Sequence, residues 1–208
     1  MKNEFRVNER KSLSLSTEPR VWAGKKQGVS EGMKPYLAGY RNGTAFWKTE
    51  VAKEANEVAK ALFYEAGRQG FRILWTCGNN ENEEKVWLPW VENTASEKAK
   101  SYLSSEGGTP YWVHPKTIGE IQEKLASGEF DMVFVTNPNT KKAQEAKRCA
   151  DVSNIPTIAC LDRSWNPRSW TRFLPISKYT VGEQQRAFFL CYFAYYAGRV
   201  TGAVETSF

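Results

Sequence analysis

Short apolar runs alternate with helical stretches along most of this chain, and the alternation narrows the folds that it can adopt. Each run is five to seven residues long, which is strand length and too short for an independent helix. The runs are residues 71–77, 110–114, 132–136 and 156–161. Because nearly continuous apolar strands that alternate with helices form right-handed βαβ units, the sequence predicts an α/β fold. We expect it to be doubly wound, with a mainly parallel sheet of Rossmann-like or flavodoxin-like type.

Helices are expected on both sides of these strands. The first has one apolar stripe at helical spacing and ends near Gly67. The stripe consists of Val51, Ala55, Val58, Ala59, Leu62 and Phe63. Further helices are predicted over residues 95–105, 117–126, 141–151 and 182–199. The last carries aromatic side chains in nearly every direction, which favours burial between the sheet and a neighbour over a ligand site.

Length and composition fit one globular domain with an added arm. The 208 residues are 41% apolar, enough for one sizeable core. We expect an extended basic arm and turn over 1–43, an α/β domain over 44–200 with an inserted loop at 81–93, and a tail at 201–208. The net charge is +6, and residues 1–50 hold ten Lys or Arg against five Glu. This excess favours a polyanionic partner, either a nucleic acid or an acidic lipid surface.

Metal and membrane functions are not indicated. The four cysteines lack C-x-x-C spacing and His114 is the only histidine, so we predict reduced core thiols, no metal site and no cofactor. The longest apolar stretch, residues 187–197, is eleven residues long, short of the roughly 20 that span a bilayer. The basic, serine-containing N-terminus suggests a mitochondrial address, but Glu4, Glu9 and Glu18 argue against one, which leaves targeting open.

One carboxylate carries the enzymatic hypothesis. Asp162 directly follows the predicted strand 156–161, and ligands of open α/β sheets bind outside the carboxyl ends of strands. Aspartate at such a position also commonly caps a turn. The residues after the first strand, Gly78-Asn79-Asn80-Glu81, match no glycine-rich phosphate-binding motif. A small doubly wound enzyme that uses Asp162 is therefore the alternative to a binding function.

Two segments combine cations with aromatic rings. Residues 33–43, M-K-P-Y-L-A-G-Y-R-N-G, hold a proline-fixed turn and place Lys34 and Arg41 beside Tyr36 and Tyr40. Charge beside a stacking plane suits RNA.

The second segment, residues 163–172, reads R-S-W-N-P-R-S-W-T-R and alternates arginines with indoles. Its arginines can bond phosphates or stack on bases. Trp165 and Trp170 either stack on RNA bases or bury against the sheet edge, and the sequence leaves both open.

The segment 33–43 resembles the signature near the start of small-subunit ribosomal protein 2 of bacterial type, where Met-Lys-Pro-Tyr, an apolar spacer and Gly-x-Arg-Asn-Gly recur together. The similarity continues to about residue 199 and includes Lys116-Thr117-Ile118. Its most specific late pairing is Asp131–Val135 followed by Ile155–Ala159. The chain departs from the family in three places. The Trp-Leu-Gly-Gly segment after the aromatic strand is missing, the long coiled-coil hairpin has shrunk to residues 119–130, and residues 81–93 are inserted.

The resemblance implies a structural protein of a small ribosomal subunit, with ribosomal RNA and neighbouring ribosomal proteins as partners. It implies no enzymatic reaction, no small-molecule substrate and no membrane. A bacterial-type core so heavily remodelled suits a mitochondrion better than a plastid. The expected ribosomal RNA contacts are Lys25, Lys26, Lys34, Tyr36, Arg41, Asn42, Arg163, Arg168 and Arg172. A free-standing RNA-binding module is a third possibility beside the ribosomal protein and the enzyme.

Overall fold

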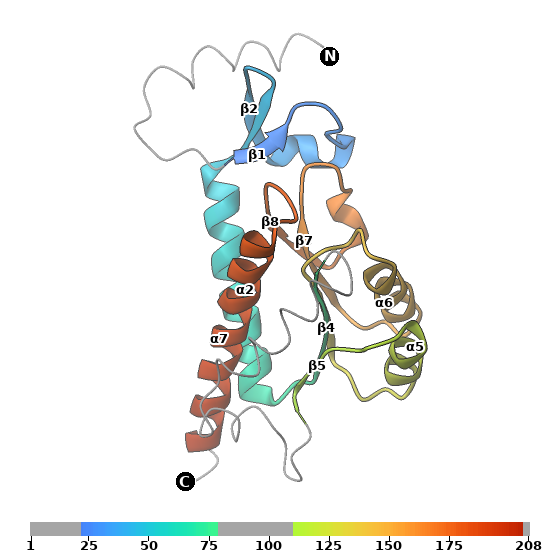
Figure 1. The fold of residues 1–208 in the computed structure, drawn as a ribbon. Coiled ribbons are helices and arrows are strands. Elements are labelled where there is room, and N and C mark those ends of the chain that lie inside the picture. Colours follow the sequence, from blue (N-terminus) through green and yellow to red (C-terminus); the bar gives the residue numbers. More distant parts are fainter. Residues whose placement is uncertain (1–21, 79–109, 206–208) are drawn as a thin grey trace.

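A computed structural model describes residues 22–78 and 110–205, and its central element is a five-stranded parallel sheet (Figure 1). In sheet order the strands are β5 (Trp112–Val113), β4 (Ile73–Thr76), β6 (Met132–Val135), β7 (Thr157–Leu161) and β8 (Arg172–Pro175). All four neighbouring pairs run parallel. The first of these strands along the chain lies between the second and the third, which is the order of flavodoxin-like doubly wound sheets. The predicted fold class is confirmed.

The four predicted strands are present, and β8 is an additional one. Its sequence, R-F-L-P, is too short and too polar at its start to stand out as an apolar run. It becomes a strand because it pairs with β7, where Ile158 lies opposite Arg172 and Leu161 opposite Pro175. Proline is tolerated there because β8 lies at the edge of the sheet.

Helices cover both faces of the sheet (Figure 1). One face carries α2 (Thr49–Gln69) and α7 (Val181–Glu205), and the other carries α5 (Ile118–Ala126) and α6 (Lys141–Val152). Successive residues of β4 explain this arrangement, because Ile73 and Trp75 belong to the core beneath α2 and α7 while Leu74 belongs to the opposite core.

Residues 119–130, where the sequence analysis expects a shortened counterpart of the long coiled-coil hairpin, form a short segment. Residues 119–130 form α5 and the turn that leads to β6, and no long helical hairpin stands there. Thr117 begins α5 and Thr140 begins α6, each by accepting a backbone N–H at the third residue of its helix.

The contact between α2 and α7 is close enough to involve the backbones directly. A Cβ atom added at Gly67 of α2 would lie 2.1 Å from the carbonyl oxygen of Tyr195 in α7. A Cβ atom at Gly198 of α7 would lie 1.9 Å from the carbonyl oxygen of Tyr64 in α2. Both glycines are therefore required by sterics, because any side chain would separate the two helices.

A second, three-stranded antiparallel sheet precedes α2. Its strands are β1 (Trp22–Lys25), β3 (Thr44–Trp47) and β2 (Leu37–Arg41) in sheet order, and a 3₁₀-helix, η1 (Glu31–Tyr36), connects β1 to β2. Asn42 (φ 47°) and Gly43 (φ 74°) form the two-residue turn between β2 and β3. Positive φ at both positions is the geometry that makes Asn-Gly the preferred type I′ hairpin turn.

The small sheet changes the expected layout of the N-terminal region. Residues 22–43 were expected to belong to an extended arm, but they share a sheet with residues 44–47, and the expected boundary at 43/44 falls inside a hairpin. The reason is the Asn-Gly turn, which brings two short strands together without a long apolar run. At the other end, α7 continues to Glu205 and so includes part of the expected tail 201–208. The rest of the arm, the helix at 95–105 and the loop at 81–93 lie outside the described residues.

We expect Gly67→Ala and Gly198→Ala each to lower the free energy of unfolding by about 1–3 kcal/mol, because each Cβ overpacks a backbone contact. Urea unfolding followed by circular dichroism measures this. Gly182→Ala is the matched control in α7, since nothing lies within 4 Å of a Cβ added there. It should be neutral or stabilising, as alanine favours helix over glycine. Equal effects at all three positions would contradict the steric role of the α2–α7 contact.

Candidate nucleic-acid interface

The tip of the small sheet presents two cations in one row. Thr44 of the central strand β3 lies opposite Lys25 of β1 on one side and Arg41 of β2 on the other. Cross-strand partners point to the same face of a sheet, so Lys25 and Arg41 flank Thr44 on one surface, about 10 Å apart at two strand spacings. Both side chains belong to exposed residues, and the described part of the chain supplies no ion pair to either.

Aromatic rings continue the same face. Phe46 is two residues along β3 from Thr44 and lies opposite Trp22 of β1, whose exposed fraction is 42%. On its other side Phe46 lies opposite Gly39, and a Cβ added at Gly39 would meet no atom within 4 Å. The ammonium of Lys178 lies over the Trp22 ring, 5.3 Å from the ring centroid.

We call Trp22, Lys25, Arg41, Thr44 and Phe46 the outer face of the small sheet. The alternating residues Ala45 and Trp47 are buried on the opposite side, at 0% and 2% exposure.

The remaining arm residues gather at the same tip. Lys26 donates its backbone N–H to the Gly43 carbonyl at 2.7 Å, and its ammonium lies 5.1 Å from the centre of the Tyr40 ring. Asn42 occupies the adjacent turn and is exposed. Lys25, Lys26, Arg41 and Asn42 are thus brought together.

Lys34 and Tyr36 lie apart from this tip, on η1. The Lys34 ammonium bonds the Glu31 carboxylate at 2.5 Å, one turn earlier. The Tyr36 ring packs edge-on against Phe173 of β8, with centroids 5.2 Å apart. One edge of the predicted stacking ring is therefore occupied by the protein itself.

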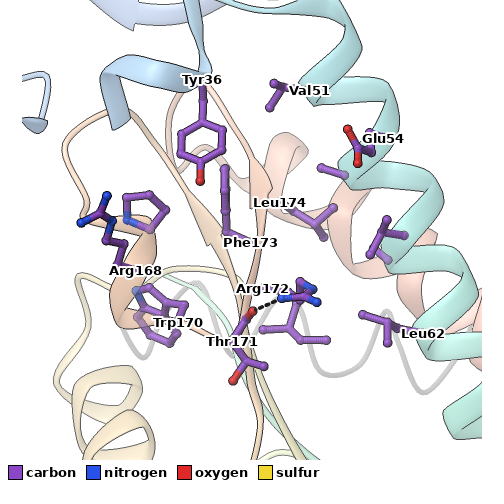
Figure 2. Close-up of a pocket in the computed structure, with 15 residues that line it drawn as sticks. Tyr36, Val51, Glu54, Leu62, Arg168, Trp170, Thr171, Arg172, Phe173 and Leu174 are labelled. Atoms are coloured by element: carbon purple, nitrogen blue, oxygen red, sulfur yellow. Dashed lines mark hydrogen bonds between the residues drawn. The ribbon is translucent and has the colours of Figure 1, made fainter. Parts of the chain in front are cut away.

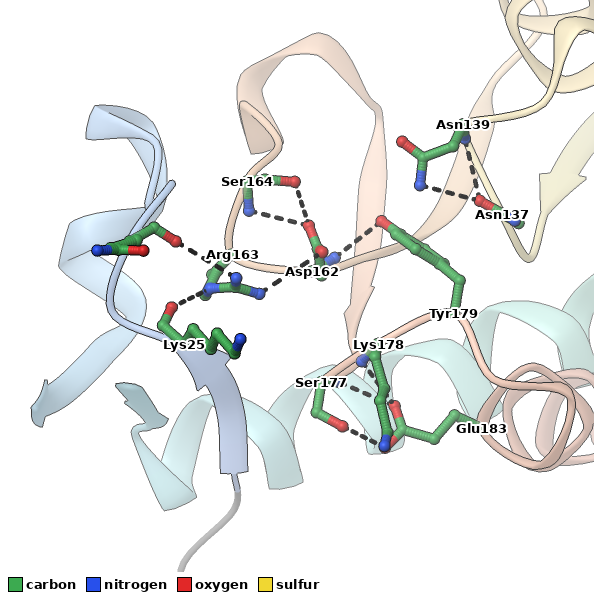
Figure 3. Close-up of polar contacts among 11 residues, drawn as sticks. Lys25, Asn137, Asn139, Asp162, Arg163, Ser164, Ser177, Lys178, Tyr179 and Glu183 are labelled. Carbon is green, nitrogen blue, oxygen red and sulfur yellow. Dashed lines mark hydrogen bonds and ion pairs between the residues drawn. The ribbon is translucent and has the colours of Figure 1, made fainter. Parts of the chain in front are cut away.

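Arg163 connects the two sheets. Its guanidinium donates to the backbone carbonyls of Lys25 and of Gln27, the latter at 3.3 Å, and lies 3.8 Å from the Asp162 carboxylate (Figure 3). The contact is close, because a Cβ added at Gly24 would lie 2.5 Å from an Arg163 nitrogen. These bonds use several of the five N–H groups that were predicted to bind RNA.

Asp162 has a structural role at the end of β7. Its Oδ1 accepts hydrogen bonds from the backbone N–H of Ser164 at 2.9 Å and from the Ser164 hydroxyl at 2.5 Å (Figure 3). Its own N–H donates to the hydroxyl of Tyr179 at 3.0 Å. Burial raises the pKa of Tyr179 above its ordinary value, and the nearby Asp162 charge adds to this effect. Asp162 therefore caps a turn, as the sequence analysis allowed.

The crevice where doubly wound sheets bind ligands lies between β4 and β6, and it is filled by an amide. Gln184 of α7 is fully buried, and its Oε1 accepts from the Gly78 N–H at 3.1 Å and from the Thr136 hydroxyl at 3.0 Å. Its Nε2 donates to the Tyr179 carbonyl at 3.2 Å. Asn137 donates to the Gly78 carbonyl at 3.2 Å beside it. Gly78, Thr136, Asn137 and Gln184 are thus partnered with each other, whereas the buried hydroxyl of Thr76 at the end of β4 has no hydrogen-bond partner among the described residues.

Arg168 and Arg172 lie away from the tip, beside α2. Both are exposed, and Arg172 donates to the Thr171 carbonyl at 2.9 Å. Trp170 is 8% exposed and packs in the core, and Trp165 packs edge-on against it at 6.3 Å. Of the two possibilities left open, burial against the sheet therefore describes Trp170.

Sequence reasoning did not identify Trp22, Phe46 and Lys178. The signal was present in Thr44-Ala45-Phe46-Trp47, where small and large residues alternate after an Asn-Gly turn, which indicates a half-buried strand. In the part of the chain that the structure describes, no group of three or more His, Cys, Asp or Glu residues could hold a metal ion. Among the same residues, no helix combines the length and the hydropathy needed to cross a membrane.

Neither a family model nor a curated protein matches this sequence.

Replacing Arg163 by alanine should loosen the small sheet and leave the large one intact. The variant removes the hydrogen bonds that the backbone carbonyls of Lys25 and Gln27 accept from Arg163. We therefore expect the free energy of unfolding to fall by about 1–3 kcal/mol. Hydrogen exchange of the amides in β1 should accelerate, whereas exchange in β4 and β6 should stay unchanged. Arg168→Ala removes an exposed arginine nearby and serves as the control. Unaltered exchange in β1 would refute the connecting role.

The single histidine should make stability pH-dependent. Burial, with a smaller contribution from the charge of Lys142, lowers the pKa of His114 from 6.5 to about 4, and the charge of Glu120 opposes this shift. Since the unfolded chain then binds the proton better, the stabilisation is complete above pH 6.5 and is lost as the pH falls toward 4. Between pH 7.5 and 4.5 the wild type should lose about 2–3 kcal/mol more than His114→Gln. Parallel urea titrations at both pH values test this, and identical losses would exclude it.

Proposed function

We propose that this protein is a structural constituent of the small ribosomal subunit of a mitochondrion, where it binds ribosomal RNA through the outer face of the small sheet. The observation that carries the proposal is the row of Lys25 and Arg41 on the face that also presents Trp22 and Phe46. Trp22 is exposed and Phe46 is half-buried, and cations beside rings that are accessible in part suit a phosphate backbone whose bases are accessible.

The resemblance of residues 33–43 to the ribosomal signature supports the same assignment, and the structure suggests what its residues do. Met33 is fully buried and anchors η1 in the core. Asn42 and Gly43 make the hairpin turn. Most of the signature thus builds the sheet, and Arg41 is the member that places a cation on the outer face of the small sheet.

The cations would supply affinity and position more than sequence preference. Lysine and arginine contacts to phosphates are largely independent of base identity. Lys25, Lys26 and Arg41 are the first expected contacts, and Lys34 is secondary because Glu31 neutralises it. Arg163 would act mainly by holding the sheet in place.

Further parts of the proposal rest on the resemblance alone. Neighbouring ribosomal proteins are the expected protein partners. The mitochondrial location follows from the shortened hairpin region and the inserted residues 81–93 in a bacterial-type core.

The contacts of Asp162 and Gln184 weigh against the enzymatic alternative. Asp162 is engaged by the backbone and hydroxyl of Ser164. Gln184 occupies the crevice in which a doubly wound enzyme would hold its ligand. A protein that supports an assembly needs neither a free carboxylate nor an open crevice at this edge.

Substituting Lys25 and Arg41 by alanine should weaken binding to small-subunit RNA and lower the dependence on salt. For single strands the slope of log K against log salt should fall by about 0.7 for each phosphate contact removed. Trp22→Ala and Phe46→Ala should each cost about 1–3 kcal/mol in binding without changing that slope. Filter binding over a range of KCl concentrations measures both quantities. Lys116→Ala, an exposed lysine before α5, is the control and should have no effect.

Sedimentation separates the ribosomal assignment from its alternatives. The full chain, tagged and expressed in its own cells, should sediment with small-subunit RNA on a sucrose gradient, and the Lys25→Ala/Arg41→Ala variant should do so less. RNA binding in vitro without co-sedimentation would point to a free-standing RNA-binding module. If the chain neither bound RNA nor sedimented with the small subunit, the proposal would be wrong.

A further inference from the structure

A groove of about 470 Å³ runs between α2 and the edge strand β8 (Figure 2). One wall comes from α2, where Val51 and Leu62 point toward the strand and Val58 also lines the groove. The other wall comes from β8, with Phe173 and Leu174. The groove is lined mainly by apolar side chains and is open to solvent.

The α2 wall is the part of the apolar stripe that residues 22–78 and 110–205 leave uncovered. Ala59 and Phe63 of the predicted stripe are buried, at 4% and 0% exposure. Val58 and Leu62 are 38% and 37% exposed, although the stripe pattern predicts that they face a core. The described residues thus bury only one side of the stripe.

The β8 wall has an unpaired backbone edge. β8 pairs with β7 on one side, and no other strand of the described residues pairs with it. Its outward N–H and C=O groups can accept another strand, which is a common mode of protein recognition. A segment paired there would lie alongside the groove, with alternate side chains directed toward α2.

The rim of the groove is positively charged. Arg168 and Arg172 are exposed, and within the described ranges neither forms an ion pair. Glu54 on α2 is the acidic residue in the lining, so two cations face one carboxylate. A ligand that carries carboxylates would complement this excess of positive charge in the groove.

We propose that the groove binds an extended, acidic and apolar segment of another protein, which pairs with β8 as a sixth strand. Its apolar side chains contact Val58 and Leu62, and its carboxylates contact Arg168 and Arg172. RNA suits this groove less well. The Phe173 ring is met by Tyr36 and Trp170 is buried, so neither offers a free stacking plane, and the aliphatic lining offers no partner to a base. The inference does not depend on RNA binding at the outer face of the small sheet.

Photo-crosslinking in the full chain tests the proposal. Leu62 is replaced by p-benzoylphenylalanine, the protein is expressed in its own cells and irradiated, and the crosslinked partner is sequenced by mass spectrometry. We expect one protein segment that alternates apolar residues with Asp or Glu. The charge reversal Arg168→Glu/Arg172→Glu should lower its yield at least fivefold, while Arg168→Lys/Arg172→Lys should retain it.

Two controls make each outcome decisive. p-Benzoylphenylalanine at Val152, which is 75% exposed on α6, measures nonspecific crosslinking, and Lys116→Glu controls for charge reversal elsewhere. Circular dichroism of each variant verifies folding. A crosslink to RNA, to this chain itself or to a basic segment would overturn the proposal, as would a yield at Leu62 no higher than at Val152. RNA binding is measured separately, with the Lys25 and Arg41 variants. A negative crosslinking result therefore leaves the proposed RNA-binding function unaffected, and a negative RNA-binding result leaves the proposed groove partner unaffected.

Discussion

The close contact between α2 and α7 sets the geometry of one face of the large sheet. Gly67 and Gly198 let the two helix backbones meet without intervening side chains. Both helices cover the same face of the large sheet, so their spacing fixes how the aromatic core beneath them packs. In that core Trp112 contacts Phe63 of α2 and Phe188 of α7, which ties the strands to both helices.

The position of α2 also determines where the small sheet lies, because β3 leads directly into this helix. A second link comes from the far end of the chain, where Arg163 and the loop after β7 hold the segment after β1. Ser30 donates its backbone N–H to the Arg163 carbonyl at 2.9 Å and its hydroxyl to the Trp165 carbonyl at 2.6 Å. The proposed RNA-binding face is thus held at both of its ends, which limits the entropy lost when it binds.

Four of the five strands of the large sheet could be predicted because the information that specifies them is local. Runs such as Met132–Val135 are apolar at every position, and the turn residues that bound them are visible in the sequence. The small sheet was missed because its strands do not form continuous apolar runs and their pairing depends on one Asn-Gly turn. Its attachment could not be foreseen either, since Lys25 and Arg163 are 138 residues apart.

The candidate site was predicted in part, for the same reason. Lys25, Lys26, Arg41 and Asn42 are near each other in sequence and meet at one tip, whereas the direction of each side chain depends on strand register. A shift of one residue would turn Trp22 and Phe46 inward. The contacts that occupy Asp162 were foreseeable as an aspartate turn, but the amide of Gln184 comes from a helix 106 residues beyond Gly78.

The filled crevice beside Gln184 has a consequence for how this fold responds to its surroundings. A doubly wound protein that holds a cofactor between its central strands gains stability by mass action, so its folded fraction rises and falls with the concentration of that molecule. Here the hydrogen bonds to the Gly78 N–H and the Thr136 hydroxyl come from a side chain of the same polypeptide. Because the amide and its partners belong to one polypeptide, these two hydrogen bonds form at a constant effective concentration and need no bound molecule to complete them.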